Sequence, residues 1–151
     1  MSEFKIEKVR FPLEITLATD ERLSATVFLE PTARHHSGPQ DPRELLNDAE
    51  PFFPVVVGGR VIIVAKDQIK LVRYGKTKDI PGVLPQVVDV KVMLSDGSVV
   101  EGGVEVEQRS DAQRLLDHLN AFEGRFLSMV AVDRTAHCLV SRKMIVGVQQ
   151  R

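Results

Sequence analysis

The sequence repeats itself, and this repetition constrains the fold more than any other feature of the chain. Residues 15–30 align without a gap with residues 92–107, so that apolar positions fall on apolar positions and one polar centre falls on the other. Residues 61–72 align in the same way with residues 137–148. Agreement in separate blocks, with shifts only between them, indicates two copies of one unit of about 60 residues.

Each copy is predicted to contain a hairpin, a short helix and a second hairpin. The first aligned blocks alternate apolar and polar residues around a short polar centre, which is typical of a half-buried β-hairpin. In the second copy Asp96-Gly97 supplies the turn, because glycine tolerates a positive φ. The helix of the first copy is expected to begin at Asp41 as N-cap, with Pro42 at its first position and Glu44 in its first turn.

The predicted fold class is therefore α+β, mainly β, with two tandem ββαββ repeats packed with pseudo-twofold symmetry into a barrel- or sandwich-like domain. Residues 1–72 are expected to form the first repeat, residues 73–86 a linker and residues 87–151 the second repeat. Because a unit of about 60 residues is only marginally stable alone, we expect the two copies to form one integrated globular unit.

The net charge and the single cysteine bear on the partners and the cellular compartment of the protein. The 151 residues carry a net charge of −1, and their acidic and basic residues are interleaved, whereas proteins that bind nucleic-acid backbone usually carry a basic excess. No apolar stretch is long enough to cross a bilayer. The single cysteine, Cys138, cannot form an internal disulfide, which fits a reducing compartment. We expect a cytoplasmic protein, of bacterial type in its Val, Leu and Arg usage, that does not enter a membrane.

Two segments resemble a known family. Residues 90–106, VKVMLSDGSVVEGGVEV, resemble the opening hairpin of Sm-like small barrels, and residues 135–148, TAHCLVSRKMIVGV, look like their closing strand pair. The sequence is also similar to uncharacterised bacterial domains with a D-G hairpin followed by a short helix. The order of elements departs from the Sm-like pattern, since the helix is expected between the second and third strands. The resemblance implies a small-barrel or β-sandwich shape and, for the Sm-like family, binding of RNA.

A search for chemical motifs yields no catalytic residue, no metal site and no cofactor site. His35 and His36 are adjacent in a loop, and a metal site needs three or four convergent ligands. His137 and Cys138 are neighbours on an expected strand, so their side chains point to opposite faces and cannot act as base and nucleophile together. Cys138 aligns with Ile62 of the first copy, which favours a buried apolar role.

The sequence therefore favours a non-enzymatic protein-interaction, adaptor or regulatory module, of the kind used in bacterial signalling. Its expected partner is another protein, and self-association stays open. One ring of Phe52-Phe53 is expected to remain exposed. An RNA- or DNA-binding small barrel is the alternative, suggested by the Sm-like hairpin and the basic residues; an enzyme or small-molecule role in a cleft between the halves ranks last. The candidate interaction residues are Arg34, His35, His36, Phe52, Lys66, Arg73, Arg142 and Lys143.

Overall fold

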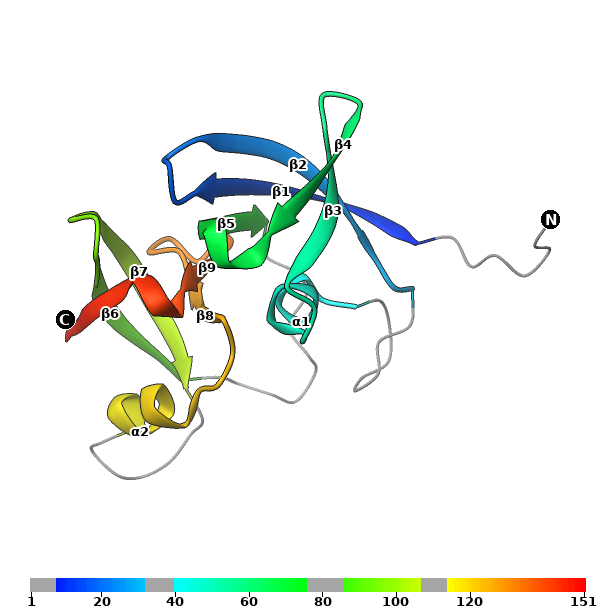
Figure 1. The fold of residues 1–151 in the computed structure, drawn as a ribbon. Coiled ribbons are helices and arrows are strands. Elements are labelled where there is room, and N and C mark those ends of the chain that lie inside the picture. Colours follow the sequence, from blue (N-terminus) through cyan, green and yellow to red (C-terminus); the bar gives the residue numbers. More distant parts are fainter. Residues whose placement is uncertain (1–7, 32–39, 76–85, 107–113) are drawn as a thin grey trace.

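The computed structural model describes residues 8–31, 40–75, 86–106 and 114–151, and in these ranges the chain forms ten strands, two α-helices and two 3-10 turns (Figure 1). The first half contains β1 (Val9–Leu17), β2 (Arg22–Leu29), α1 (Pro42–Asn47), β3 (Phe52–Val57), β4 (Arg60–Ala65), η1 (Lys66–Gln68) and β5 (Ile69–Gly75). The second half contains β6 (Gln86–Leu94), β7 (Val99–Val106), α2 (Arg114–Ala121), β8 (Phe126–Val130), β9 (Ala136–Ser141), η2 (Arg142–Met144) and β10 (Ile145–Gln150).

All ten described strands belong to one open antiparallel sheet. Its order is β10-β6-β7-β8-β9-β5-β1-β2-β3-β4. Each half contributes five consecutive strands of this order, arranged as fifth, first, second, third and fourth. The two halves meet where β5 pairs with β9, with Leu71 opposite Val140 and Val72 opposite Leu139. A ladder of main-chain hydrogen bonds therefore crosses from one half to the other.

The predicted fold class is wrong. The protein is nearly all antiparallel sheet and is not an α+β fold of two ββαββ repeats, because each half has a fifth strand, β5 or β10, that the predicted unit omits. Each of these strands follows a 3-10 turn that begins at Lys66 or Arg142. The helices are short, so the sheet carries the architecture.

The predicted pseudo-twofold packing is also wrong. A twofold axis brings together equivalent surfaces, so it would pair a strand with its own counterpart. Here the fifth strand of the first half pairs with the fourth strand of the second half. The relation between the halves is therefore head to tail, and it leaves β4 and β10 as the outer strands of the described sheet.

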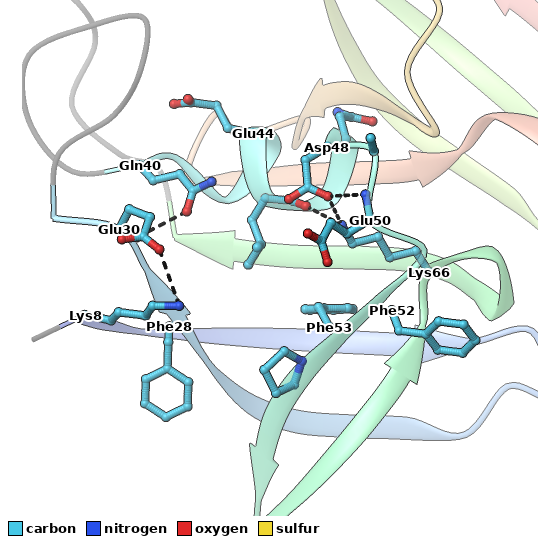
Figure 2. A pocket seen from close by; sticks show the side chains of 14 residues that line it. Lys8, Phe28, Glu30, Gln40, Glu44, Asp48, Glu50, Phe52, Phe53 and Lys66 are labelled. Carbon is cyan, nitrogen blue, oxygen red and sulfur yellow. Dashed lines mark hydrogen bonds and ion pairs between the residues drawn. The ribbon is translucent and has the colours of Figure 1, made fainter. Parts of the chain in front are cut away.

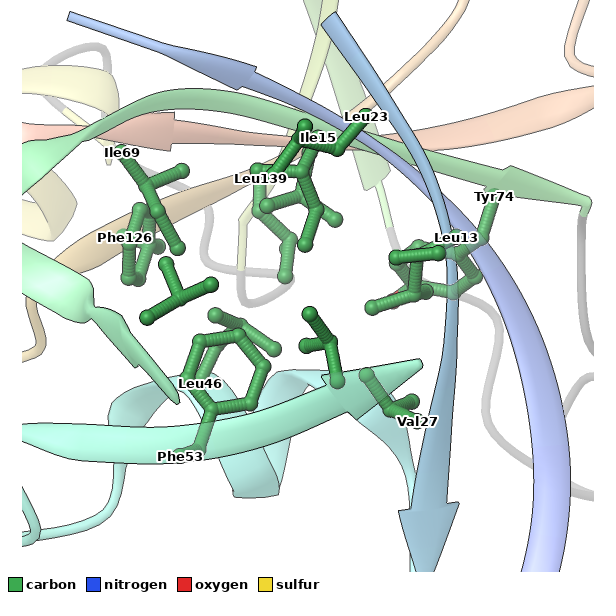
Figure 3. Close-up of a cluster of buried hydrophobic side chains, with 14 of the residues drawn as sticks. Leu13, Ile15, Leu23, Val27, Leu46, Phe53, Ile69, Tyr74, Phe126 and Leu139 are labelled. Atoms are coloured by element: carbon green, nitrogen blue, oxygen red, sulfur yellow. The ribbon is translucent and has the colours of Figure 1, made fainter. Parts of the chain in front are cut away.

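The buried side chains form two cores. The first gathers residues from β1 to β5 and α1, and the second gathers residues from β6 to β10. Phe126 and Leu139 belong to the second half but lie in the first core, among Ile15, Ile69 and Leu46 (Figure 3). In return, Leu71 of β5 packs against the second core. The junction between the halves is therefore apolar as well as hydrogen-bonded.

Local signals in the sequence account for the start of α1 and for the turns. Asp41 caps α1 and accepts a hydrogen bond from the Arg43 N–H at 2.8 Å, while Glu44 accepts one from the Asp41 N–H at 3.1 Å. These two bonds form a capping box, and they confirm the predicted N-cap at Asp41. Gly97 takes a φ of 87° in the β6–β7 turn, and Asp20 takes a φ of 70° in the β1–β2 turn. The short hairpins thus form where the polar centres stand.

The expected linker begins inside a strand. Arg73 and Gly75 belong to β5, which continues the sheet beyond residue 72, and Gln86 is the first residue of β6. Residues 76–85 lie outside the described ranges, as does the segment that precedes α2 at residues 107–113.

Candidate functional site

The most distinctive surface of the described chain is the outer strand β4 with the neighbouring Phe52, a set we call the β4 edge. Val61 is 68% exposed, Ile63 is 71% exposed and Phe52 is 57% exposed. β4 pairs only with β3 in the described sheet, so one row of its N–H and C=O groups has no strand beside it. An apolar strand with an unpaired backbone row is a template for a further strand.

The backbone of the β3–β4 hairpin explains why these side chains are exposed. Phe53 lies opposite Val64, and both face the first core, so strand alternation turns Ile63 outward. The connecting turn uses Gly58 and Gly59 at φ values of 57° and 78°, which side chains rarely adopt. The hairpin is thus held in register while its outer face stays apolar.

A groove of about 700 Å³ adjoins the β4 edge between α1 and β3 (Figure 2). Its lining includes the acidic residues Glu30, Glu44, Asp48 and Glu50, and Glu30 pairs with Lys8 at 3.4 Å. Phe52 lines one end of the groove, and Phe28 lines another part. The groove therefore offers aromatic and acidic groups beside the open strand.

Lys66 also lines this groove, and its ammonium group is paired within the chain. The side chain is buried, its Nζ donates to the Leu45 carbonyl at 2.7 Å, and it pairs with the Asp48 carboxylate (Figure 2). The same Nζ lies 5.7 Å from the centre of the Phe53 ring. A cation at this position stabilises the carboxyl end of α1. Lys66 is therefore placed as a structural residue, and it faces α1 rather than solvent.

A second polar cluster lies around the start of α1. Burial by itself raises the pKa of Asp41, but the hydrogen bonds and charge of Arg43 outweigh it and hold that pKa below its usual value. The Tyr74 hydroxyl donates to Asp41 at 3.4 Å, and burial with the Asp41 charge raises the pKa of Tyr74. At neutral pH the Asp41 carboxylate therefore stays charged and the Tyr74 phenol stays protonated. Their hydrogen bonds hold the start of α1 in place, which is a structural role.

The Cys138 and His137 side chains point apart. Cys138 belongs to the second core, while the His137 ring lies 5.1 Å from the Tyr74 ring on the other face of β9. Burial raises the pKa of the Cys138 thiol to about 11, against a smaller opposing effect of Arg73. A thiol in this state is a poor nucleophile at neutral pH.

The remaining candidate residues do not converge on one site. Arg73 is exposed on β5, opposite Cys138. Arg142 donates to the Phe122 carbonyl at 2.6 Å, and Lys143 lies 4.0 Å from the Asp67 carboxylate. Phe52 lies at the β4 edge and Phe53 is buried, as the sequence predicted for one exposed ring. The candidates Arg34, His35 and His36 lie outside the described residues.

The sequence reasoning did not single out Val61 and Ile63. Residues 61–64, VIIV, form a continuous apolar run, which is also what a fully buried strand looks like. Only the strand order shows that β4 is an outer strand. The clue present in the sequence was this run beside the glycine turn, followed by the charged Lys66.

In the described ranges, no three His, Cys, Asp or Glu side chains are grouped so as to hold a metal ion. None of the helices in the same ranges has the length and apolarity needed to cross a membrane. Comparisons with family models, with curated proteins and with solved structures find no match to this chain.

Proposed function

We propose that this chain is a non-enzymatic protein-interaction or adaptor module that acts in the cytoplasm and binds a protein partner through the β4 edge. The observation that carries the proposal is the exposure of Val61 and Ile63 on the outer strand of the described sheet. Exposed apolar side chains on an edge strand invite aggregation unless a specific partner covers them. Covering them is therefore a reasonable role for a partner.

The expected mode of binding is the addition of a strand. A partner segment beside β4 would exchange main-chain hydrogen bonds with its unpaired row, while its side chains contact Ile63 and Phe52. The main chain supplies affinity in this mode, and the alternating side chains supply specificity. The adjoining groove extends the contact surface beyond the strand itself.

Nucleic-acid binding, which the Sm-like resemblance implies, has less support. Several cations that could contact phosphate are paired within the chain: Lys66 with Asp48, and Lys70 with Asp96 at 2.6 Å. Arg134 is paired with Asp89 at 2.8 Å. A surface whose cations are already neutralised gives little of the electrostatic attraction on which such binding depends.

An enzymatic role also has less support. The groups with raised or lowered pKa values serve the cap of α1, the second core or the turns, and Cys138 and His137 point apart. Catalytic groups need to converge on one reacting atom, and these do not. The proposal therefore includes no catalytic residue and no cofactor.

The test is affinity capture from the native cell with three forms of the chain. Ile63→Lys places a charge at the centre of the β4 edge, and Val9→Lys places the same charge on the interior strand β1, where Val9 is also exposed. A partner that is recovered with the wild type and with Val9→Lys, but lost with Ile63→Lys, supports the proposal. Equal recovery by all three forms contradicts it.

A further inference from the structure

We infer that the partner of the β4 edge is a second copy of this chain, which binds head to tail through its β10 edge. The inference rests on the proposed function, because it names the partner of the same surface. Within a single chain, the first half already binds the surface of the second half that corresponds to the β4 edge.

The two halves match position by position around that junction. Phe52 lies opposite Ala65, the residue before η1, and Phe126 lies opposite Ser141, the residue before η2. Ile63 and Leu139 each stand three residues before the start of the same turns. Phe52 thus corresponds to Phe126, and Ile63 corresponds to Leu139.

The matching residues differ sharply in exposure. Phe126 and Leu139 are 1% and 0% exposed, because they insert into the core of the first half (Figure 3). Among the residues that the structure describes, Phe52 and Ile63 have no such neighbour and remain mostly exposed. The β3–β4 hairpin of the first half therefore exposes two apolar side chains, and the β8–β9 hairpin of the second half buries the two at the matching positions.

The surface that binds Phe126 and Leu139 in the first half also differs in exposure from the corresponding surface of the second half. In the first half, Leu46, Ile69 and Val72 are fully buried, and they share a core with Phe126 and Leu139. The offset that relates Ile63 to Leu139 relates Ile69 and Val72 to Ile145 and Val148. These two residues and Leu119 of α2 pack against the second core but stay partly exposed. We call Leu119, Ile145 and Val148 the socket of the second half; they are apolar and only partly covered by the described chain.

A Leu-Asn pair occurs in both helices. Asn47, which follows Leu46 on α1, accepts from the Phe126 N–H at 2.8 Å and donates to the Phe126 carbonyl at 3.3 Å. Asn120 follows Leu119 on α2 in the same way, and it is exposed. In the head-to-tail contact, Asn120 would hold the main chain of Phe52 from the next copy as Asn47 holds that of Phe126.

The internal ladder also fixes the register of the contact. Val72 lies opposite Leu139, and Arg73 lies opposite Cys138. Substituting the corresponding positions places Val148 opposite Ile63 and Gln149 opposite Ile62. The contact therefore adds β4 of one copy to β10 of the next as an antiparallel pair, and every copy offers one strand at each end.

The contact between copies is weaker than the internal one. Leu71, which reaches from β5 into the second core, corresponds to Gly147, and Lys70, which pairs with Asp96, corresponds to Val146. The covalent connection between the halves is missing as well. We therefore expect reversible association that grows with concentration.

The first experiment measures mass against concentration by analytical ultracentrifugation of the purified chain, from about 1 µM to about 1 mM. The wild type and Val9→Lys should form dimers and larger species as concentration rises. Ile63→Lys, blocked at β4, and Asn120→Lys, blocked at the socket, should each remain monomeric. A wild type that stays monomeric throughout the range overturns the inference.

The second experiment mixes the two blocked variants. Ile63→Lys keeps an intact socket and Asn120→Lys keeps an intact β4 edge, so together they should form a one-to-one dimer and nothing larger. If β4 edges paired with each other, Asn120→Lys alone would dimerise and the mixture would show no dimer containing both variants. That result contradicts head-to-tail binding.

The third experiment tests the register by oxidation. A copy with Ile62→Cys and a copy with Gln149→Cys should become linked by a disulfide, because these positions lie opposite each other. Ile63→Cys with Gln149→Cys is the control, since Ile63 points to the other face of the strand. The native Cys138 is buried in all of these proteins and does not compete. Equal linkage in both mixtures overturns the register.

These outcomes separate the inference from the function on which it rests. A monomeric chain that still captures another protein, in a way that Ile63→Lys abolishes, removes self-association and leaves the interaction function standing. A chain that neither associates nor captures a partner through the β4 edge removes both.

Discussion

Asn47 holds the backbone of Phe126 from both sides, accepting from its N–H and donating to its carbonyl, although 79 residues separate the two in the sequence. The helix α1 of the first half thereby fixes the first residue of β8 in the second half. This pair of hydrogen bonds, the insertion of Phe126 and the β5–β9 ladder act at the same place, so the junction between the halves is specific in its polar and apolar contacts.

Asn47→Ala should destabilise the protein by about 1–3 kcal/mol, because it leaves two main-chain groups of a buried residue without their partner. The free energy of unfolding in urea, measured at low concentration, checks this. The matched control is Asn120→Ala on the exposed position of α2, which should change the unfolding free energy by no more than about 0.5 kcal/mol. Equal effects of both substitutions would contradict the anchoring role of Asn47.

Phe126→Ala and Phe52→Ala should differ widely although they remove the same ring from matching positions. Phe126 is in the first core, so its loss should cost about 3–5 kcal/mol of unfolding free energy. Phe52 is mostly exposed in a single chain, so its loss should cost no more than about 0.5 kcal/mol in dilute protein. Urea denaturation of both variants, at concentrations where the chain is monomeric, is the measurement.

Gly102→Ala should be strongly destabilising. A Cβ at this position would lie 2.4 Å from the Val130 carbonyl oxygen, so the β7 and β8 backbones would have to separate. Forced overpacking of this kind typically costs about 1–3 kcal/mol. Gly75→Ala serves as the control, because a Cβ there meets nothing within 4 Å. Thermal unfolding curves that place the two variants together would show that the close approach of β7 to β8 is unimportant.

Stability should fall in acid partly through Asp41. Because Arg43 holds the folded pKa of Asp41 below its ordinary value of 3.8, the ionised carboxylate stabilises the fold above that pH, and this contribution is lost as the pH falls through the folded pKa. Asp41→Asn keeps a good helix cap but loses the charge, so it should be less stable than the wild type by about 0.5–1 kcal/mol at pH 7.

The gap in unfolding free energy between wild type and Asp41→Asn should narrow between pH 7 and about pH 2.5, because the contribution of the Asp41 charge falls once the pH drops below the unfolded pKa of that carboxyl. Urea denaturation at the two pH values measures it. Asp117→Asn, on the exposed face of α2, controls for the general effect of removing one carboxylate. A gap that stays constant with pH would mean that the Asp41 charge does not stabilise the fold.

Local features of this fold could be predicted from the sequence because they depend on few neighbouring residues. The capping box at Asp41 and Glu44 and the turn at Gly97 follow from side-chain chemistry within a few residues. The burial of Phe53 beside an exposed Phe52 follows from strand alternation. These parts of the candidate site were accessible without a structure.

The arrangement of the strands could not be predicted in the same way. Alternation shows which face a side chain takes, but not which strand lies beside it, so Ile63 and Leu139 look alike in the sequence although one is exposed and the other buried. The similarity between the two halves of the sequence suggested a pair of units related by a twofold axis. Two similar units can equally pair head to tail, as they do here through β5 and β9. The β4 edge was missed for the same reason, because the sequence does not show that β4 has a neighbouring strand on one side only.

The fixed junction between β5 and β9 has a geometrical consequence for any assembly that repeats it. Each junction fixes the angle between successive halves, and in such an assembly each molecule would contribute two junctions, one within itself and one to its neighbour. A closed ring would therefore contain an even number of half-molecules, and a contact whose rotation does not close would produce an open helical filament instead. If the contact between copies repeats the internal junction, the angle between the two halves of one chain determines whether the assembly is a closed ring or a fibre.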